Sequence, residues 1–239
     1  MKRTALHWAS VAGYSHIVQV LLKHNAKDAL SDVTKATALH YAASKNHIQC
    51  VINLTEGRKY AYLPDAEGRT PIVWAILKGH VQTLRVLLDN GVDIETRDFQ
   101  KCTPLHAAAS SGNTMCASLL LQYGIQIDSL DLFSRTALFK TIENGHAETA
   151  ALLLQKGANC SISDEDGRMP IHFAAMFGRL NVLSLLLASG ADPNVKDLTG
   201  KTPLHCAAYN GNVAAIKFLI KSLAEVDMRD FDGITALHW

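Results

Sequence analysis

The tetrapeptide Thr103-Pro104-Leu105-His106 decides the fold, because variants of it recur along the 239-residue chain at a constant step of 33 residues. The series begins at Thr4-Ala5-Leu6-His7 and closes at Thr235-Ala236-Leu237-His238, with Met169 in place of the threonine in one copy. A fixed period of this length is typical of a solenoid, in which each unit packs only on its neighbours. The chain is therefore predicted to form a linear array of about seven repeats.

The first half of each repeat carries the signals of a short, capped helix. Threonine suits the N-cap, because its hydroxyl accepts a hydrogen bond from a free amide of the first turn. Proline often follows, where its missing N–H does no harm, and the histidine at the third helical position can reach back to the threonine as in a capping box. A residue suited to the left-handed C-cap conformation then ends the helix; these residues are Gly13, Asn46, Gly79, Gly112, Gly145, Gly178 and Gly211.

The second half of each repeat predicts another helix followed by a projecting turn. Leucine-rich segments, such as residues 119–121 and 185–187, form the apolar face of this second helix. After its closing glycine comes a polar segment that indicates a tight β-turn, in which a carboxylate holds its own backbone. The aspartates at this fixed position are Asp32, Asp65, Asp98, Asp131, Asp164, Asp197 and Asp230.

This order of helix, helix and β-hairpin finger resembles the ankyrin repeat, whose T-P-L-H-x-A core recurs here. The resemblance implies an all-α repeat solenoid that extends as a single ankyrin-repeat array over residues 1–239. Neither end of the sequence reads as the polar capping repeat that solenoids usually have, so we expect an array cut from a longer one at both ends. We expect a binding surface and no catalytic activity.

Composition narrows the class of partner. The net charge is +1, with acids and bases nearly balanced, which argues against nucleic-acid binding. No apolar run of the sequence approaches the roughly 18 residues of a membrane span, so no direct membrane insertion is expected. Five cysteines without a C-x-x-C pair are typical of reduced thiols in an intracellular protein. We therefore expect a cytoplasmic monomer that binds protein.

The eleven histidines do not indicate a metal or catalytic site. Six occupy the capping position, and His47, His80 and His146 follow the residue that ends the first helix, at another fixed position. Equivalent histidines of stacked repeats lie roughly 10 Å apart, too far to share a zinc ion. No phosphate-binding loop, zinc-protease motif or nucleophile elbow occurs in the sequence. We expect no cofactor, no metal and no enzyme in this chain.

Partner contacts are expected where the repeat leaves its residues free to vary. Those positions are the finger tips and the outward side of the first helix, which together line the concave face of such stacks. The tips are unusually apolar, a basic series precedes the first helices, and aromatic residues beside arginine are typical of interface hot spots. The residues predicted to contact a partner are Trp74, Leu77, Lys78, Phe99, Gln100, Leu132, Phe133, Arg135, Lys140, Glu143, Arg168, Phe173, Met176, Phe177 and Tyr209.

Several of these positions allow a second interpretation. The aromatic residues that follow the histidine position, Trp74 and Phe173, are compatible with burial between adjacent first helices, and tip aromatics are compatible with packing on neighbouring fingers. In the second repeat Arg58 stands where the closing glycine belongs, and residues 59–64 replace the polar finger. That irregular segment is either a weak point of the array or a specialised edge for binding.

Two further hypotheses concern modification and context. Residues 186–194 resemble the stretch that the asparaginyl hydroxylase of ankyrin proteins modifies, with Asn194 as the acceptor. The chain as a whole is also compatible with a regulatory array fused to an enzyme or channel whose working domain lies elsewhere.

Individual repeats also resemble those of the inversin family, ankyrin arrays of the primary cilium. The likeness follows the same order and register, and it includes irregular features; examples are the segment Glu67-Gly68-Arg69-Thr70, the Leu138-Phe139 variant without histidine, and Asp192-Pro193-Asn194-Val195. The resemblance implies a scaffold at the cilium or cytoskeleton that binds nephrocystin-type ciliary proteins, and that influences Wnt signalling through dishevelled.

Overall fold

The structure, a computed structural model, describes residues 3–56 and 62–239. Within these residues it contains fourteen α-helices that form seven helix–turn–helix pairs, which confirms the predicted all-α repeat fold. The chain divides into two compact units, Met1–Gln126 and Ile127–Trp239, and each is described by itself. Across the described residues, no helix is long and apolar enough to cross a membrane.

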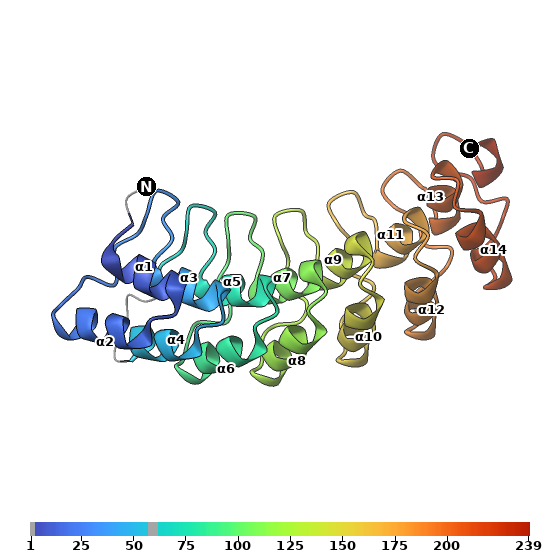
Figure 1. Cartoon of the computed structure of the whole chain (residues 1–239). Coiled ribbons are helices and arrows are strands. Elements are labelled where there is room, and N and C mark those ends of the chain that lie inside the picture. The colour runs from blue at the N-terminus through green and yellow to red at the C-terminus, as the bar shows by residue number, and fades with distance from the viewer. Residues whose placement is uncertain (1–2, 57–61) are drawn as a thin grey trace. The chain divides into compact units, whose positions relative to one another are not determined.

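The first unit contains four helix pairs stacked side by side (Figure 1). Odd-numbered helices pack on one another in one row, and even-numbered helices form a second row against it. The core between the two rows is apolar and includes the fully buried Ile72, Leu84 and Leu105. The elements are α1 (Ala5–Ala12), α2 (Ser15–Lys23), α3 (Ala38–Ser44), α4 (Ile48–Thr55), α5 (Pro71–Leu77), α6 (Val81–Asp89), α7 (Pro104–Ser111) and α8 (Thr114–Gln122).

The second unit repeats this plan with three pairs and a final 3-10 helix that packs on α13. Leu153, Leu183 and Leu186 are among its fully buried side chains. Its elements are α9 (Ala137–Asn144), α10 (Ala147–Gln155), α11 (Pro170–Met176), α12 (Leu180–Ala188), α13 (Pro203–Tyr209), α14 (Val213–Lys221) and η2 (Ala236–His238).

The predicted histidine caps are confirmed, and four of the histidines also tie one repeat to the next. At the start of α3, the Thr37 N–H donates to Nδ1 of His40 over 3.0 Å. Nε2 of His40 therefore carries the proton, and it lies 3.0 Å from the carbonyl oxygen of Arg69 in the following repeat. His7, His172 and His205 make the same contact to the next repeat, with Ala36, Lys201 and Ile234 respectively.

The fingers are turns held by their aspartates. Oδ1 of Asp65 accepts hydrogen bonds from the backbone N–H groups of Glu67 and Arg69, at 2.8 and 2.9 Å, and the other finger aspartates do the same. Among the described residues, backbone pairing within a finger amounts to isolated bridges such as Ser31–Thr37, so the fingers carry no extended strands. The turn is too short for further backbone hydrogen bonds between its two arms, and the aspartate carboxylate holds it instead.

Left-handed backbone occurs at the residues predicted to end the first helices, for example at Gly13 with φ 80°, and also at a fixed turn position of the fingers, where Gly68 has φ 82°. The same turn position in three other fingers holds residues with a side chain: Lys35, Lys101 and Ser134 have φ values of 57°, 57° and 59°. Because such residues are strained in this region, the finger hydrogen bonds must offset a conformational cost at these three positions.

The irregular second repeat is described only in part. Its helix α4 ends at Thr55, and Arg58 and residues 59–61 lie outside the described residues.

Candidate protein interface

The residue that follows the histidine position in each repeat lies nine positions after the finger aspartate, and we call it the ring position. It is held by Tyr41, Trp74, Ala107, Lys140, Phe173, Cys206 and Trp239. It begins the outward side of the odd-numbered helix, directly beneath the finger. We call the surface formed by the fingers and this side of the odd-numbered helices the finger face of each unit.

In two repeats of the first unit the ring position satisfies the second oxygen of the finger aspartate. The Tyr41 hydroxyl donates to Oδ2 of Asp32 over 2.6 Å, and Arg3 lies 4.4 Å above the Tyr41 ring. Trp74 Nε1 donates to Oδ2 of Asp65 over 2.9 Å. Burial opposes the charged form of Asp65, but the hydrogen bond from Trp74 and those from the backbone outweigh it and lower the pKa of this carboxyl.

Trp74 is therefore half-buried, with its polar edge already occupied. Its ring lies edge-on to His40 at 5.1 Å and to Tyr41 at 5.6 Å, measured between ring centroids. The part of α5 that remains exposed is its C-terminal end, at Leu77 and Lys78.

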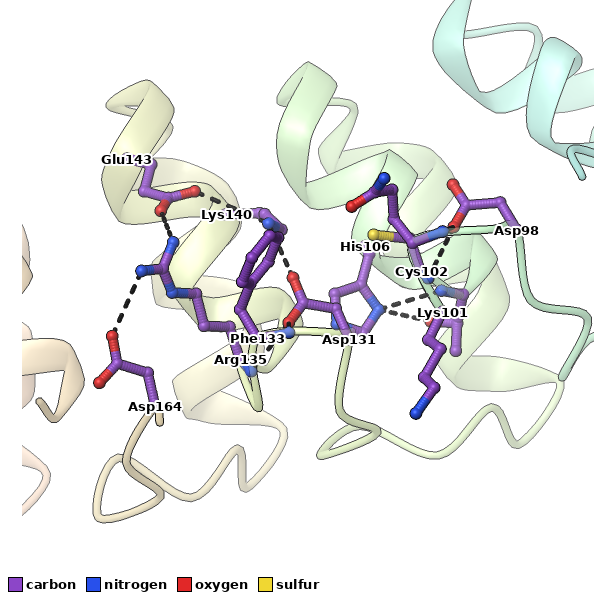
Figure 2. Close-up of polar contacts among 12 residues, drawn as sticks. Asp98, Lys101, Cys102, His106, Asp131, Phe133, Arg135, Lys140, Glu143 and Asp164 are labelled. Carbon is purple, nitrogen blue, oxygen red and sulfur yellow. Dashed lines mark hydrogen bonds and ion pairs between the residues drawn. The ribbon is translucent and has the colours of Figure 1, made fainter. Parts of the chain in front are cut away.

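In the second unit a chain of charges connects two fingers through α9 (Figure 2). Lys140 at the ring position lies 2.8 Å from Oδ2 of Asp131 and 3.9 Å from Glu143. Arg135 contacts Glu143 at 2.8 Å and Oδ2 of Asp164, in the next finger, at 3.3 Å. Burial acts to raise the pKa of Asp131. Lys140 and the backbone N–H groups of the turn lower it by a larger amount, so the pKa of this carboxyl lies below its usual value.

Phe173 belongs to the core of this unit. Only 3% of it is exposed, its ring packs edge-on to Phe139 at 5.2 Å, and the Arg135 guanidinium lies 4.8 Å above it. Phe177, one turn further along, is exposed and lies beside Arg179 at 6.0 Å. Phe173 is therefore buried between adjacent odd-numbered helices, as the second interpretation of the aromatic residues after the histidine position allows.

The predicted contact residues fall into three groups by exposure. The exposed ones are Leu77, Lys78, Phe99, Gln100, Leu132, Phe133, Phe177 and Tyr209. The half-buried ones are Trp74, Arg135, Lys140, Glu143, Arg168 and Met176, and the buried one is Phe173. Arg168 is paired with Asp166 at the tip of its own finger.

The finger tips are both packed and exposed. The Phe99 N–H donates to the carbonyl oxygen of Glu67 in the preceding finger over 3.1 Å. Its ring lies against Gly68, where an added Cβ would stand 2.9 Å from Phe99 Cδ1. Nevertheless 68% of Phe99 remains exposed, so the ring is oriented by its neighbour and still offers most of its surface to a partner. Leu198 and Phe231 pack in the same way on Gly167 and Gly200.

A pocket of about 340 Å³ on the finger face of the second unit was not predicted. It is lined by Arg168, Met176, Cys206, Tyr209 and Trp239, among others, and so it brings together three of the predicted contact residues, Arg168, Met176 and Tyr209. The signal in the sequence was the short side chain of Cys206 at a position that holds a large ring or a lysine in every other repeat except that of Ala107.

Asn194 is half-buried and makes two contacts with the repeat that follows. Its Oδ1 accepts the N–H of Glu225 over 2.8 Å, and its Nδ2 donates to the carbonyl oxygen of Leu223 over 3.3 Å. Hydroxylation at this residue remains a prediction, and an enzyme would have to reach a side chain that is engaged in these bonds.

Two buried cysteines and a buried histidine of this chain are held in their neutral forms. Burial raises the pKa of Cys116 to about 11 and that of Cys206 to about 12, so both thiols are protonated at neutral pH. Burial also lowers the pKa of His40 to about 4, which keeps this imidazole neutral. In the part of the chain that the structure describes, no group of three or more His, Cys, Asp or Glu side chains is placed to hold a metal ion.

Comparison with known proteins agrees with this architecture. A family model for ankyrin repeats in three copies matches residues 1–63, 53–131 and 126–197, and a second ankyrin model, for many copies, matches residues 178–220. No curated protein matches the sequence.

Two solved structures have the same fold. The ankyrin repeat domain of human ASB11 superposes with a TM-score of 0.81 and 24% sequence identity, over 92% of this chain and 97% of that one; at this identity the likeness concerns the fold alone. The ankyrin repeat domain of Bcl-3, a member of the IkappaB protein family, superposes with a TM-score of 0.80 and 29% identity, over 92% of this chain and 99% of that one. With its repeats matched by the family models and its helix pairs superposed on ankyrin domains, the chain belongs to the ankyrin repeat family.

Proposed function

We propose that this chain is a non-catalytic scaffold that binds protein partners on its finger faces. The observation that carries the proposal is the set of large apolar side chains that the fold orients on these faces and leaves uncovered, with Phe99 and Tyr209 each 68% exposed. Burying one such side chain at an interface contributes about 1.5–3 kcal/mol. A few of them are enough to account for specific association.

The charges around these side chains support the same conclusion. Arg135 lies 5.7 Å from the Phe133 ring and also pairs with Glu143 and Asp164. A guanidinium fixed in this way loses little conformational entropy when a partner docks on it. Fixed arginines beside exposed aromatic rings are the composition expected at the centre of a protein interface.

A comparison of two triple variants tests the face. Phe99→Ala/Phe133→Ala/Phe177→Ala removes apolar surface from the finger faces. The matched control Met115→Ala/Leu180→Ala/Val213→Ala removes exposed apolar surface from the even-numbered helices. Each variant is checked by circular dichroism and then used to capture proteins from a cell lysate beside the unchanged chain. We expect partners to be retained by the control and lost from the finger-face variant. The reverse pattern would place the interface on the even-numbered helices.

The identity of the partner is a finer part of the proposal. The sequence points shared with the inversin family support a cytoplasmic, monomeric scaffold at the cilium that binds nephrocystin-type proteins or dishevelled; no comparison with a solved structure or a family model supports this assignment beyond the ankyrin repeat itself. The same capture, repeated with lysates of ciliated and non-ciliated cells, tests it. Loss of every ciliary protein from the captured set would overturn the ciliary role and leave the scaffold function intact.

A further inference from the structure

The ring position of α13 is a gap in a series of large side chains. The neighbouring odd-numbered helices of the second unit carry Lys140 and Phe173, and Trp239 follows at the next repeat. Cys206 in α13 is much shorter than any of these, and the pocket of about 340 Å³ lies at this point. The wall beside it is aromatic, because Tyr209 and Trp239 meet edge-on with ring centroids 5.1 Å apart.

A carboxylate oxygen at this pocket lacks a donor from the chain. Asp197 is only 7% exposed, and its Oδ1 accepts the N–H groups of Thr199 and Lys201 at 2.8 and 2.9 Å. The described part of the chain supplies no hydrogen-bond donor to its Oδ2. A ligand that supplies a donor here makes a hydrogen bond to a charged group, which is stronger than one between neutral groups.

Other repeats of the same chain indicate what completes such a site. Oδ2 of the equivalent aspartates receives the Tyr41 hydroxyl at 2.6 Å and the Trp74 Nε1 at 2.9 Å. In both cases the aromatic ring occupies the ring position, and its O–H or N–H group donates to the carboxylate. Asp98, nine positions before Ala107, is only half-buried, so water competes more strongly for its carboxylate than at the buried Asp197.

Two cationic side chains that line the pocket, Arg168 and Lys201, also favour the binding of an aromatic ring. The residue that precedes the capping threonine stacks on a ring in other repeats: Arg3 lies 4.4 Å from the Tyr41 ring, and Arg135 lies 4.8 Å from the Phe173 ring. The equivalent residue at the pocket is Arg168, which pairs with the exposed Asp166 and not with Asp197. Arg168 and Lys201 favour the face of a ring and disfavour a second cation.

We propose that this Cys206 pocket binds a tryptophan or tyrosine side chain of a partner protein. The ring occupies the volume that Tyr41 and Trp74 fill in their own repeats, its N–H or O–H donates to Oδ2 of Asp197, and Arg168 stacks on its face. The inference rests on the proposed scaffold function, and it adds the chemistry of the residue that the partner inserts.

Small capped amino acids test the pocket without any knowledge of the partner. The whole chain is labelled at its methionine methyl groups, and the NMR signal of Met176, in the pocket wall, is followed during titration with N-acetyl-tryptophanamide, N-acetyl-tyrosinamide and N-acetyl-phenylalaninamide. We expect saturable shifts with dissociation constants of about millimolar for the first two, as is usual for such small ligands. Phenylalanine lacks the donor and should bind about tenfold more weakly.

Two substitutions separate the donor contact from simple burial of a ring. Asp197→Asn keeps an oxygen for the turn and removes the charged acceptor, so it should abolish the preference for tryptophan and tyrosine over phenylalanine. Cys206→Tyr fills the pocket with the chain's own ring, as Tyr41 does, and should abolish binding of all three probes. Asp232→Asn, at an exposed aspartate of the next finger, is the control and should change nothing.

Three results would overturn the proposal. They are the absence of a saturable Met176 shift, an unchanged preference in Asp197→Asn, or tighter binding of N-acetyl-lysinamide than of the aromatic probes. None of them depends on the finger-face capture experiment, so failure of the pocket would be distinguished from failure of the scaffold function. If Cys206→Tyr does not fold, the comparison of Asp197→Asn with Asp232→Asn still tests whether the ring donates to Asp197.

Discussion

Mild acid should weaken the first unit through a single buried imidazole. His40 is completely inaccessible to solvent, accepts a hydrogen bond from the Thr37 N–H and donates to the Arg69 carbonyl. Burial lowers its pKa from the usual 6.5 to about 4, against smaller opposing effects of the Arg69 carbonyl and Asp65. Protonation would require Nδ1 to give up its role as acceptor in the cap, so the folded state resists it.

The sign and size of the effect follow from linkage. The folded pKa lies below the unfolded one, so the unfolded chain binds the proton more readily between pH 6.5 and 4. Stability is therefore complete above pH 6.5 and falls as the pH is lowered through this window. With pKa values of 6.5 and about 4, His40 lowers the free energy of unfolding by about 2 kcal/mol at pH 5 and by about 3 kcal/mol below pH 4.

Urea unfolding at pH 7 and pH 5 measures this loss, with tryptophan fluorescence as the signal because Trp74 lies 5.1 Å from His40. The variant His40→Phe copies the Phe139 of another repeat, which is also fully buried. It should be less stable at pH 7, since the bond to Arg69 is lost, but its pH dependence should be smaller by about 2 kcal/mol. The control His24→Gln removes an exposed histidine and should leave the pH dependence unchanged.

A pKa of 6 or more for His40 in an NMR titration of the folded chain would refute this reasoning. So would a His40→Phe variant that loses as much stability between pH 7 and pH 5 as the unchanged chain does.

Three further substitutions test other contacts by their effect on urea unfolding at pH 7. Trp74→Phe removes the donor on Oδ2 of Asp65 and should cost about 2 kcal/mol, as expected for a hydrogen bond to a charged group; a loss below 0.5 kcal/mol would show that water replaces it. Gly200→Ala, at φ 80° with a Cβ 2.7 Å from the Phe231 ring, should cost about 2 kcal/mol or more. Lys101→Gly relieves left-handed backbone at φ 57° and should stabilise by up to about 1 kcal/mol, whereas a destabilisation would mean that the lysine side chain contributes to the finger.

The periodic features of the fold could be predicted from the sequence because each depends on residues close to one another in the chain. The capping contact joins Thr37 to His40, three positions apart, and the finger bonds join Asp65 to Glu67 and Arg69. Local spacing fixes such contacts, so the caps and turns were confirmed. The left-handed residue Lys101 was missed, since nothing in a lysine indicates positive φ; only its position in the repeat does.

The candidate interface was harder to predict because exposure at the ring position depends on neighbouring repeats. Trp74 and Phe173 occupy equivalent positions, yet the first is half-buried with its nitrogen bonded to a carboxylate and the second is buried under Arg135. The pocket at Cys206 arises because the cysteine side chain is too short to fill the volume at its position. No reactive or charged residue in the sequence indicates such a site. Only the difference between Cys206 and the residues at the same position of the other repeats does.

The histidine contacts between repeats have a consequence for cooperativity. Where the capping position holds His40, one side chain couples the folding of its repeat to that of the next. In the third repeat this position holds Val73, which cannot make this bond. The side-chain contacts that remain across the junction include Thr70 with Thr96 at 3.4 Å and Asn113 Nδ2 with the Ile76 carbonyl oxygen at 2.6 Å, so the junction lacks the histidine bond and keeps others. In an array whose stability is a sum of repeat and nearest-neighbour terms, a weaker junction is where partial unfolding stops or starts. We therefore expect the first unit to open between α5–α6 and α7–α8, so that the fragment before this boundary exchanges its amide hydrogens as one block.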